Sequence, residues 1–203
     1  MSTAPAADLS PVRAEKAALR AALRQHRAAV PATAAESIAV ARAAGLPGLR
    51  AAPVVAVYHA LAGELDPAPL GAALREGGAA LCYPRVVSLR PPRLSFHRID
   101  DPAALVPGPF QLREPAPDAP EVAPAAFVVP GLAFDRAGFR LGFGAGLYDA
   151  ALSACPAALR VGLCPDAALR EALPHEEHDE PMDLIVTPSE ILVTAARPLG
   201  GAS

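Results

Sequence analysis

Tryptophan is absent from the 203-residue chain, and lysine occurs only once, at Lys16, among 18 basic residues. Three cysteines are present (Cys82, Cys155 and Cys164), without the C-x-x-C spacing of zinc and redox motifs. An odd number of cysteines in this arrangement argues against a disulfide framework and favours a reducing compartment. Because each cysteine has apolar neighbours in the sequence, we expect all three to be buried as small hydrophobic side chains.

Long apolar runs and a large excess of either charge are also absent. No uninterrupted apolar stretch approaches the length of a membrane span, and residues 1–8 have neither the basic start nor the apolar core of a signal peptide. The net charge of −3 at pH 7 does not suggest a basic surface for nucleic acid. We expect a cytoplasmic protein, acting as a monomer, that binds neither a membrane nor a nucleic acid.

The order of the predicted elements indicates an α/β protein. With 203 residues, of which 52% are hydrophobic, the chain suits one compact domain. Short apolar runs alternate with segments of helical periodicity, which is the pattern of a mainly parallel sheet covered by helices. We expect the domain to span residues 10–197, with frayed termini at 1–9 and 198–203. The predicted strands are 53–58, 79–83, 127–129, 159–164, 183–187 and 191–195, with a hairpin at 86–89 and 94–97, and the predicted helices are 11–29, 33–45, 67–77, one after Gly146, and 166–173.

A glycine-rich loop lies between a predicted strand and a predicted helix. Its core is Arg140-x-Gly142-x-Gly144-x-Gly146. Glycines at alternate positions allow positive φ angles and the close approach of a ligand, and the helix start favours an anion. Arg140 adds a planar donor fork suited to phosphate, and Asp149 is placed to face a metal ion on that phosphate. The alternative is an ordinary loop, because the spacing is neither the Rossmann nor the Walker motif.

The first predicted helix carries a basic face. It begins at Ser10 as N-cap, and Glu15 is its only acidic residue. The basic residues at spacings of three and four are Arg13, Lys16, Arg20, Arg24 and Arg27. Such a face is either an anion-binding surface or a solvated face. The single lysine either marks a place where arginine does not serve or is simply the last lysine left.

Acidic residues gather in two predicted loops. Glu64 lies in the loop 59–66, at the carboxyl end of a strand, where open α/β sheets bind ligands. Residues 174–180 hold two histidines and four acids. Zinc is one interpretation of that segment, but its H-E-E-H order is not the H-E-x-x-H motif.

The glycine-rich loop and its flanks resemble the signature of the 5-formyltetrahydrofolate cyclo-ligase family. The resemblance rests on residues 130–135, Gly138, Arg140-Leu141-Gly142, Gly144, Gly146 and Tyr148-Asp149. The chain departs from the family at Leu147, where tyrosine is usual, and mildly at Ala145. Three further segments resemble the family: Lys16-x-x-x-Arg20, the stretch from Tyr58 to Glu64-Leu65-Asp66, and His178-Asp179.

The resemblance implies a single three-layer α/β domain of the NagB/RpiA/CoA-transferase type. It also implies that ATP and 5-formyltetrahydrofolate are converted to 5,10-methenyltetrahydrofolate, ADP and phosphate, with Mg²⁺ as cofactor. The formyl oxygen would be phosphorylated, N10 would attack, and phosphate would leave without a protein nucleophile.

The resemblance also implies a role for each matching residue. The catalytic residues are Lys16 and Arg140. The ATP-binding residues are Lys16, Arg20, Arg140, Leu141, Gly142, Phe143, Gly144, Ala145, Gly146, Leu147 and Tyr148. The substrate-binding residues are Arg20, His59, Glu64, Phe143, Gly144, Ala145, Gly146 and Leu147. The metal ligands are Asp149 and Asp179, since oxygen ligands suit magnesium.

Two other functions remain open from the sequence. One is a nucleotide- or phosphate-binding protein on the same fold without cyclo-ligase activity, which the departure at Leu147 keeps in view. The other is a non-catalytic folate-binding protein, which the intact glycine-rich loop makes the weaker of the two. ATP binding without folate-dependent turnover would favour the first, and folate binding unaffected by ATP would favour the second.

Overall fold

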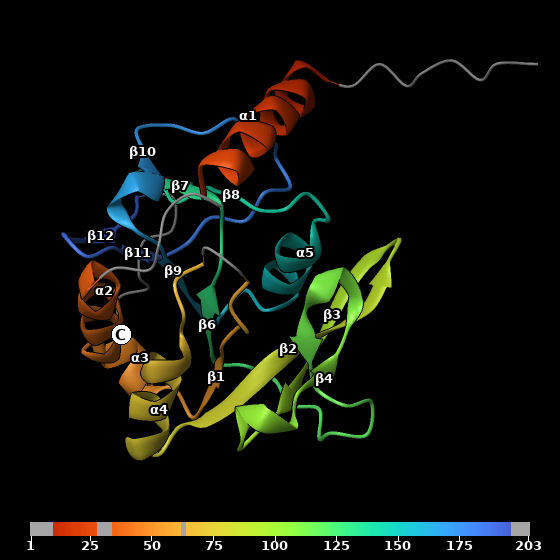
Figure 1. Ribbon diagram of the computed structural model, residues 1–203, viewed down its shortest axis with the longest axis vertical. Coiled ribbons are helices and arrows are strands. Elements are labelled where there is room, and N and C mark those ends of the chain that lie inside the picture. The colour runs from red at the N-terminus through yellow and green to blue at the C-terminus, as the bar shows by residue number, and fades with distance from the viewer. Residues whose placement is uncertain (1–9, 28–33, 62–63, 196–203) are drawn as a thin grey trace, which may run out of the picture.

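The structure is a computed structural model that describes residues 10–27, 34–61 and 64–195 (Figure 1). Its helices are α1 (Pro11–Arg27), α2 (Ala34–Ala44), α3 (Pro47–Ala51), α4 (Ala68–Glu76) and α5 (Leu147–Ala154). The strands of the main sheet are β1 (Val54–Ala56), β2 (Ala80–Leu89), β3 (Pro92–Arg98), β6 (Ala126–Val129), β9 (Leu159–Leu163), β11 (Leu184–Val186) and β12 (Ile191–Val193). Two small sheets contain β7 (Ala133–Asp135), β8 (Arg140–Leu141) and β10 (Leu169–Arg170), and β4 (Val106–Pro107) and β5 (Arg113–Glu114).

The main sheet is parallel at its centre and antiparallel at both edges. Its strand order is β12-β11-β9-β6-β1-β2-β3. The neighbours from β11 through β2 all pair in parallel, whereas β12 and β3 pair antiparallel with β11 and β2. The prediction of an α/β fold with a mainly parallel sheet is therefore confirmed.

The two faces of the sheet belong to two hydrophobic cores. Successive side chains of a strand point to opposite faces. Val55 and Val57 accordingly pack with residues of α2, α3 and α4, whereas Ala56 packs with Leu152 of α5 on the other face. Burial on both faces explains why the central strands are continuous apolar runs rather than alternating ones. Figure 1 shows α2, α3 and α4 on one side of the sheet and α5 on the other.

The strand order reverses between β1 and β6. From β1 the chain proceeds to β2 on one side, and from β6 to β9 and β11 on the other. Ligands of open α/β sheets bind beyond the carboxyl ends of the strands at such a reversal. The chain leaves β1 at Tyr58 and His59 and leaves β6 at Pro130, so these residues lie at the expected binding edge.

Helix α1 lies over the small sheet of β7, β8 and β10 (Figure 1). The Ser10 hydroxyl accepts a hydrogen bond of 3.3 Å from the Arg13 amide, which confirms Ser10 as the N-cap. Leu19 and Leu23 pack against a small core that contains Leu141. The apolar side of α1 is thus anchored next to the strand that leads into the glycine-rich loop.

Two local predictions are wrong. The predicted strand 79–83 and the first arm of the hairpin are one strand, β2. This is possible because β1 pairs only with residues 80–82, so the missing amide of Pro84 costs no hydrogen bond to β1. The predicted helix 166–173 is a short 3₁₀ turn followed by β10, which pairs with β7. Residues 47–51, to which the sequence assigned no element, form α3.

Some predictions lie outside the described residues. These are the frayed termini, the end of the first helix beyond Arg27 and the start of the second predicted helix at Thr33. Within the described residues, no helix is both long and apolar enough to cross a membrane.

Candidate active site

The glycine-rich loop connects β8 to α5 and has two residues with positive φ. Gly144 has φ 103° and Gly146 has φ 67°, and Gly146 is the N-cap of α5. Gly142 does not have a positive φ, so the loop needs glycine for its backbone at two of the three positions. In the described part of the chain, the amides of Gly144, Ala145 and Gly146 donate no hydrogen bond. These amides are therefore available to a ligand.

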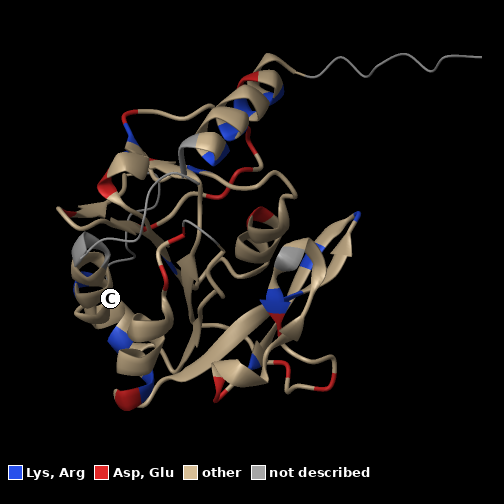
Figure 2. Ribbon diagram, in the orientation of Figure 1, with Lys and Arg blue, Asp and Glu red and all other residues tan. Residues whose placement is uncertain are grey.

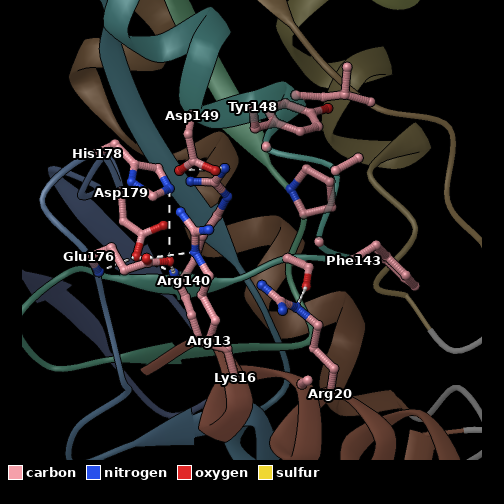
Figure 3. A pocket seen from close by; sticks show the side chains of 17 residues that line it. Arg13, Lys16, Arg20, Arg140, Phe143, Tyr148, Asp149, Glu176, His178 and Asp179 are labelled. Atoms are coloured by element: carbon pink, nitrogen blue, oxygen red, sulfur yellow. Dashed lines mark hydrogen bonds and ion pairs between the residues drawn. The ribbon is translucent and has the colours of Figure 1, made fainter. Parts of the chain in front are cut away.

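A cavity of about 490 Å³ opens beside this loop, and we call it the charged cavity (Figure 3). Four separate parts of the described chain line it: α1, Pro130 after β6, the stretch from β8 into α5, and the acidic segment 176–179. The lining residues are Arg13, Lys16, Ala17, Arg20, Pro130, Arg140, Gly142, Phe143, Gly144, Ala145, Gly146, Leu147, Tyr148, Asp149, Glu176, His178 and Asp179. Figure 2 shows basic residues along α1 and acidic ones in the loops close to it.

Cations and carboxylates are paired inside the charged cavity. Lys16 Nζ lies 2.5 Å from Asp179 Oδ2, and Lys16 is only 4% exposed. Arg140 Nη2 lies 3.1 Å from Asp149 Oδ1. A buried ammonium group is costly unless it is paired. Lys16 therefore does not lie on a solvated face.

The pKa values of the acids reflect these pairs. Burial by itself would raise the pKa of Asp179, but the hydrogen bonds from Lys16 and from the Glu176 amide outweigh burial and lower it. The pKa of Glu176 is also lowered, because Arg13 and Lys16 together outweigh the effect of burial. Both carboxylates are therefore charged at neutral pH.

The other basic residues of α1 contact different partners. Arg13 Nε lies 3.0 Å from Glu176 Oε1 at the rim of the charged cavity. Arg20 Nε donates to the Gly142 carbonyl at 3.0 Å, and Arg24 Nη2 donates to the Phe143 carbonyl at 2.8 Å. Burial, followed by the nearby charge of Arg24, lowers the pKa of Arg20. The side chain of Arg27 lies outside the part that can be described.

A buried arginine, Arg160, is linked to Asp149 through Glu180. Arg160 Nη1 lies 2.7 Å from Glu180 Oε2, and Arg160 Nη2 donates to the Leu152 carbonyl at the end of α5. The Glu180 amide in turn donates to Asp149 Oδ1 at 3.2 Å. Sequence reasoning missed Arg160, since an arginine in the middle of a predicted strand has no local signal of this contact.

A second cavity, of about 80 Å³, adjoins the first, and we call it the small cavity. It is largely apolar and is lined by Tyr58, His59, Glu64, Pro84, Val86, Leu94, Leu112, Arg113, Pro130, Leu147 and Tyr148. Pro130, Leu147 and Tyr148 line both cavities. A third, more open cavity of about 650 Å³ continues from the small one past Tyr58, His59 and Arg113.

Glu64 and His59 bring polar groups to the small cavity. Glu64 Oε2 accepts a hydrogen bond of 2.9 Å from the Leu61 amide, which holds the carboxylate in place. His59 Nδ1 is buried and has no hydrogen-bond partner among the described residues. The Tyr58 hydroxyl donates to the Leu65 carbonyl at 2.7 Å and closes the loop that carries Glu64.

The structure brings together most of the residues singled out in the sequence. Lys16, Arg20, Arg140, Asp149 and Asp179 all face the charged cavity, and Leu147 lines both cavities. Leu141 is different: it is fully buried and packs with Ala133 and Leu173 rather than lining either cavity.

Two residues of the acidic segment that line the charged cavity received no role from the sequence. Glu176 and His178 belong to the acidic segment, which was noticed, but only Asp179 received a role there. Their distance from α1 along the chain concealed the contact. Within the described residues, no three histidine, cysteine or acidic side chains converge as a metal site, so the zinc interpretation gains no support.

The cysteines lie away from this chemistry. Cys82 and Cys164 are buried, as predicted, and Cys155 is half-buried. Burial raises the pKa of Cys82 to about 12, and burial with a smaller effect of Asp166 raises that of Cys164 to about 12. Both therefore remain protonated and are not nucleophiles.

Comparison with known proteins agrees with this geometry. The model of the 5-formyltetrahydrofolate cyclo-ligase family matches residues 12–188. Two proteins named 5-formyltetrahydrofolate cyclo-ligase are similar in sequence. The one from Escherichia coli (strain K12) is 34% identical over 143 residues, which cover 68% of this chain and 79% of the relative. The one from Mycolicibacterium smegmatis is 35% identical over 187 residues, 88% of this chain and 96% of the relative.

Solved structures give the same answer. The NMR structure of Aquifex aeolicus 5,10-methenyltetrahydrofolate synthetase matches with a TM-score of 0.77 and 28% identity, covering 93% of this chain and 96% of that one. A 5,10-methenyltetrahydrofolate synthetase from Mycoplasma pneumoniae matches with a TM-score of 0.65 over 85% of this chain and 98% of that one. At 21% identity, the second match shows the fold alone.

Proposed function

Because this chain belongs to the 5-formyltetrahydrofolate cyclo-ligase family, we propose that its two adjoining cavities bind ATP and 5-formyltetrahydrofolate for conversion to 5,10-methenyltetrahydrofolate, ADP and phosphate. The protein is then an ATP-dependent ligase that forms a carbon–nitrogen bond. The observation that carries the residue assignment is that the charged and small cavities share Pro130, Leu147 and Tyr148. A phosphate donor in one cavity and a folate in the other would meet at that wall.

The charged cavity suits the triphosphate of ATP. The unpaired amides of Gly144, Ala145 and Gly146 stand at the start of α5, where the helix dipole also favours an anion. Lys16 and Arg140 add buried positive charge on two sides. Preorganised charge of this kind is what phosphoryl transfer requires of a protein. We therefore assign Lys16 and Arg140 as catalytic residues, with Arg20 and the loop binding ATP.

The small cavity suits the pterin ring of the folate. Its walls are mostly apolar, and Glu64 is the only carboxylate among the described residues that line it. A carboxylate can accept two N–H bonds from an aminopyrimidinone edge, which makes Glu64 the proposed anchor of the ring. His59, whose Nδ1 has no partner among the described residues, would line the same substrate.

The chemistry needs positioning more than it needs a reactive side chain. Transfer of the γ-phosphoryl group to the formyl oxygen turns a poor leaving group into phosphate. The folate N10 then attacks the formyl carbon, a C–N bond forms, and the C–O bond to phosphate breaks. Among the described residues, no serine or cysteine lines the charged cavity or the small one, in keeping with a reaction without a protein nucleophile. Holding both substrates in line supplies much of the rate.

Asp149 and Asp179 are the proposed magnesium ligands. Each uses one carboxylate oxygen for the contacts above, Asp149 Oδ1 and Asp179 Oδ2, and the other oxygen of each contacts no described residue. Oxygen ligands from one or two carboxylates, with phosphates completing the shell, are what magnesium commonly takes in ATP sites. The residues therefore fit the ion. When bound, magnesium would neutralise charge on the phosphates.

The direct test is turnover. Pure protein mixed with ATP, magnesium and 5-formyltetrahydrofolate is expected to give a rise in the near-ultraviolet absorbance of the methenyl product. A rise that also occurs without ATP, or no rise at all, would contradict the proposed reaction. ATP binding without turnover would instead point to a nucleotide-binding relative, which the names of the similar proteins do not favour.

The metal assignment has its own test. Asp149→Asn and Asp179→Asn are each expected to raise the magnesium concentration that gives half-maximal turnover, by roughly tenfold, since each removes a charged oxygen ligand. Direct magnesium titration by calorimetry in the presence of ADP provides a second readout. Unchanged magnesium dependence in one variant would remove that residue from the metal site.

We also propose that the protein works as a monomer in the cytoplasm. The cysteines within the described residues are free, which suits a reducing compartment. Sedimentation of the pure protein at working concentration checks the first point.

A further inference from the structure

Arg24 occupies an unusual place beside the glycine-rich loop. It lies one turn beyond Arg20 on α1, is exposed, and does not line the charged cavity. Yet its Nη2 donates to the Phe143 carbonyl at 2.8 Å, and its guanidinium carbon lies 5.4 Å from the centre of the Phe143 ring. Two contacts to one loop residue are more than a solvated arginine makes.

The arginine pair on α1 has a cost that these contacts offset. Like charges four residues apart destabilise a helix, and the proximity of Arg24 contributes to the lowered pKa of Arg20. Arg20 and Arg24 nevertheless both turn toward the loop and hold two successive carbonyls, those of Gly142 and Phe143. Figure 3 shows the Arg20 side chain reaching the loop beside Phe143.

A hydrogen bond to a backbone carbonyl also fixes the direction of the amide in the same peptide unit. A peptide unit is planar and trans, so its C=O and N–H point in opposite directions. The Phe143 carbonyl belongs to the same unit as the Gly144 amide, which donates no hydrogen bond in the described part of the chain. Gly144 has φ 103°, and a Cβ there would lie 3.4 Å from the Arg20 guanidinium. Because glycine can adopt many backbone conformations, a hydrogen bond from another element is needed to keep this peptide unit in one orientation.

We propose that Arg24 is a positioning residue for ATP, because it fixes the Phe143–Gly144 peptide so that the Gly144 amide is set for a phosphate oxygen. This rests on the proposed function, in which the glycine-rich loop binds ATP. Arg24 acts on the nucleotide through the loop and not by contact. Phe143 and Gly144, to which the resemblance also gave a substrate-binding role, line the charged cavity and not the small one. Removal of Arg24 therefore weakens ATP binding, while the folate affinity that we assign to the small cavity is kept.

The test compares Arg24→Ala and Arg24→Lys with two controls. Gln25→Ala changes the next exposed residue of the same helix. Arg50→Ala removes an exposed arginine on α3 whose side chain makes no hydrogen bond with a described residue. ATP affinity is measured by calorimetry with magnesium, and the KM for 5-formyltetrahydrofolate by steady-state kinetics. Thermal unfolding reports on the fold.

Arg24→Ala is expected to weaken ATP binding by about three- to tenfold, the effect of losing a partly exposed charged hydrogen bond. Arg24→Lys should fall between Arg24→Ala and the wild type, because lysine keeps the charge but cannot stack flat on the Phe143 ring. The folate KM should change by less than about twofold in every variant. Both controls should bind ATP as the wild type does.

Two results would overturn the inference. One is equal ATP affinity in Arg24→Ala and Gln25→Ala. The other is a parallel loss of ATP affinity, folate KM and thermal stability, which would make Arg24 a structural residue only. If Arg24→Ala does not fold, Arg24→Lys alone decides the test. Wild-type ATP affinity of Arg24→Lys would contradict the role that we give to the guanidinium, which lies over the Phe143 ring and donates to the Phe143 carbonyl. A wild-type protein that binds no ATP would instead overturn the proposed function itself.

Discussion

The charged cavity and the small cavity share a wall but are built in opposite ways. The residues of the charged cavity come from segments far apart in the sequence, and its cations and carboxylates neutralise one another. The small cavity lies at the reversal of the strand order, and its lining is mostly apolar with a single carboxylate, Glu64. Charge pairs fix the side chains of the charged cavity, whereas mainly apolar packing next to the sheet forms the small cavity.

The difference bears on how each substrate is bound. In the charged cavity the pairs Lys16–Asp179 and Arg140–Asp149 keep buried charges satisfied before any ligand arrives. When ATP and magnesium bind, they would replace some of these contacts, and the charged side chains would already be in position. In the small cavity a flat ring needs only apolar walls and one bidentate anchor. Substitutions in the first cavity should therefore affect rate, metal use and stability, and those in the second mainly folate affinity.

The largest expected effect is that of Lys16→Arg. The ammonium group is buried against Asp179, where a larger planar guanidinium does not fit the same position. We expect activity to fall by about 10²-fold, because small displacements of reacting groups have effects of that size. Steady-state kinetics of the folded variant measures this. Arg50→Lys, the reverse change at an exposed site, is the control, and a wild-type kcat and ATP KM in Lys16→Arg would show that lysine is incidental.

Glu64→Gln should come next and should act on one substrate only. Glutamine keeps the shape but loses the charge and one acceptor, and a charged hydrogen bond contributes about 1.5–3 kcal/mol. The folate dissociation constant should therefore rise by roughly 10- to 100-fold, with ATP affinity unchanged. Fluorescence titration measures the first and calorimetry the second. Glu76→Gln, an exposed change on α4, serves as control. Equal folate affinity in both variants would remove Glu64 from the site.

Acid should weaken the charged cavity through Asp179. Its pKa lies below the ordinary value of 3.8, because Lys16 and the Glu176 amide outweigh burial. A carboxyl whose pKa is lowered by folding stabilises the protein above its unfolded pKa, and this stabilisation is lost as the pH falls through the folded pKa. The free energy of unfolding should therefore decrease below about pH 4.

The pH effect is checked by urea unfolding at several pH values. Asp179→Asn should flatten the slope at acid pH, because asparagine does not titrate. Asp118→Asn, a change at an exposed aspartate, should leave the slope as it is. Identical slopes in the two variants would show that the Lys16–Asp179 pair does not contribute to the acid response.

The smallest expected effect is that of Leu147→Tyr, at the wall shared by the two cavities. The family usually has tyrosine there, and an aromatic ring against the pterin adds about 0.5–1.5 kcal/mol. Folate affinity should improve by a few-fold at most, while ATP affinity should stay within about twofold. Parallel titrations of both substrates test this. A loss of ATP affinity alone would place Leu147 with the charged cavity rather than between the two.

Much of the site was predictable because its signals are local. Arg140, Gly142, Gly144 and Gly146 lie in one continuous stretch of sequence. The helix start that follows them belongs to the same stretch, so the sequence alone shows that the loop brings its amides to the start of a helix. The alternation of apolar runs with helical segments likewise predicted a parallel sheet. The helix start at Ser10 was readable from a single residue and the proline after it.

The errors share one cause, which is that tertiary pairing overrode local pattern. Residues 166–173 have a helical pattern, yet Leu169 and Arg170 pair with Phe134 and Asp135 instead. The long strand β2 continues through Pro84 because its neighbour β1 has already ended there. No window of sequence contains the partner that decides such cases.

By itself, the sequence determined the α/β class, the glycine-rich loop and the residue types that suit a phosphate and a folate, because these depend on contiguous residues and on hydrophobic period. Only the tertiary structure decided which charges meet. Lys16 and Asp179 are 163 residues apart, yet the Lys16 Nζ and the Asp179 carboxylate lie at hydrogen-bonding distance. Arg24 likewise reaches the Phe143 carbonyl across 119 residues. Such pairs arise when packing of the core brings α1 onto the loop, and the low dielectric around the buried Lys16 then strengthens its pairing with Asp179.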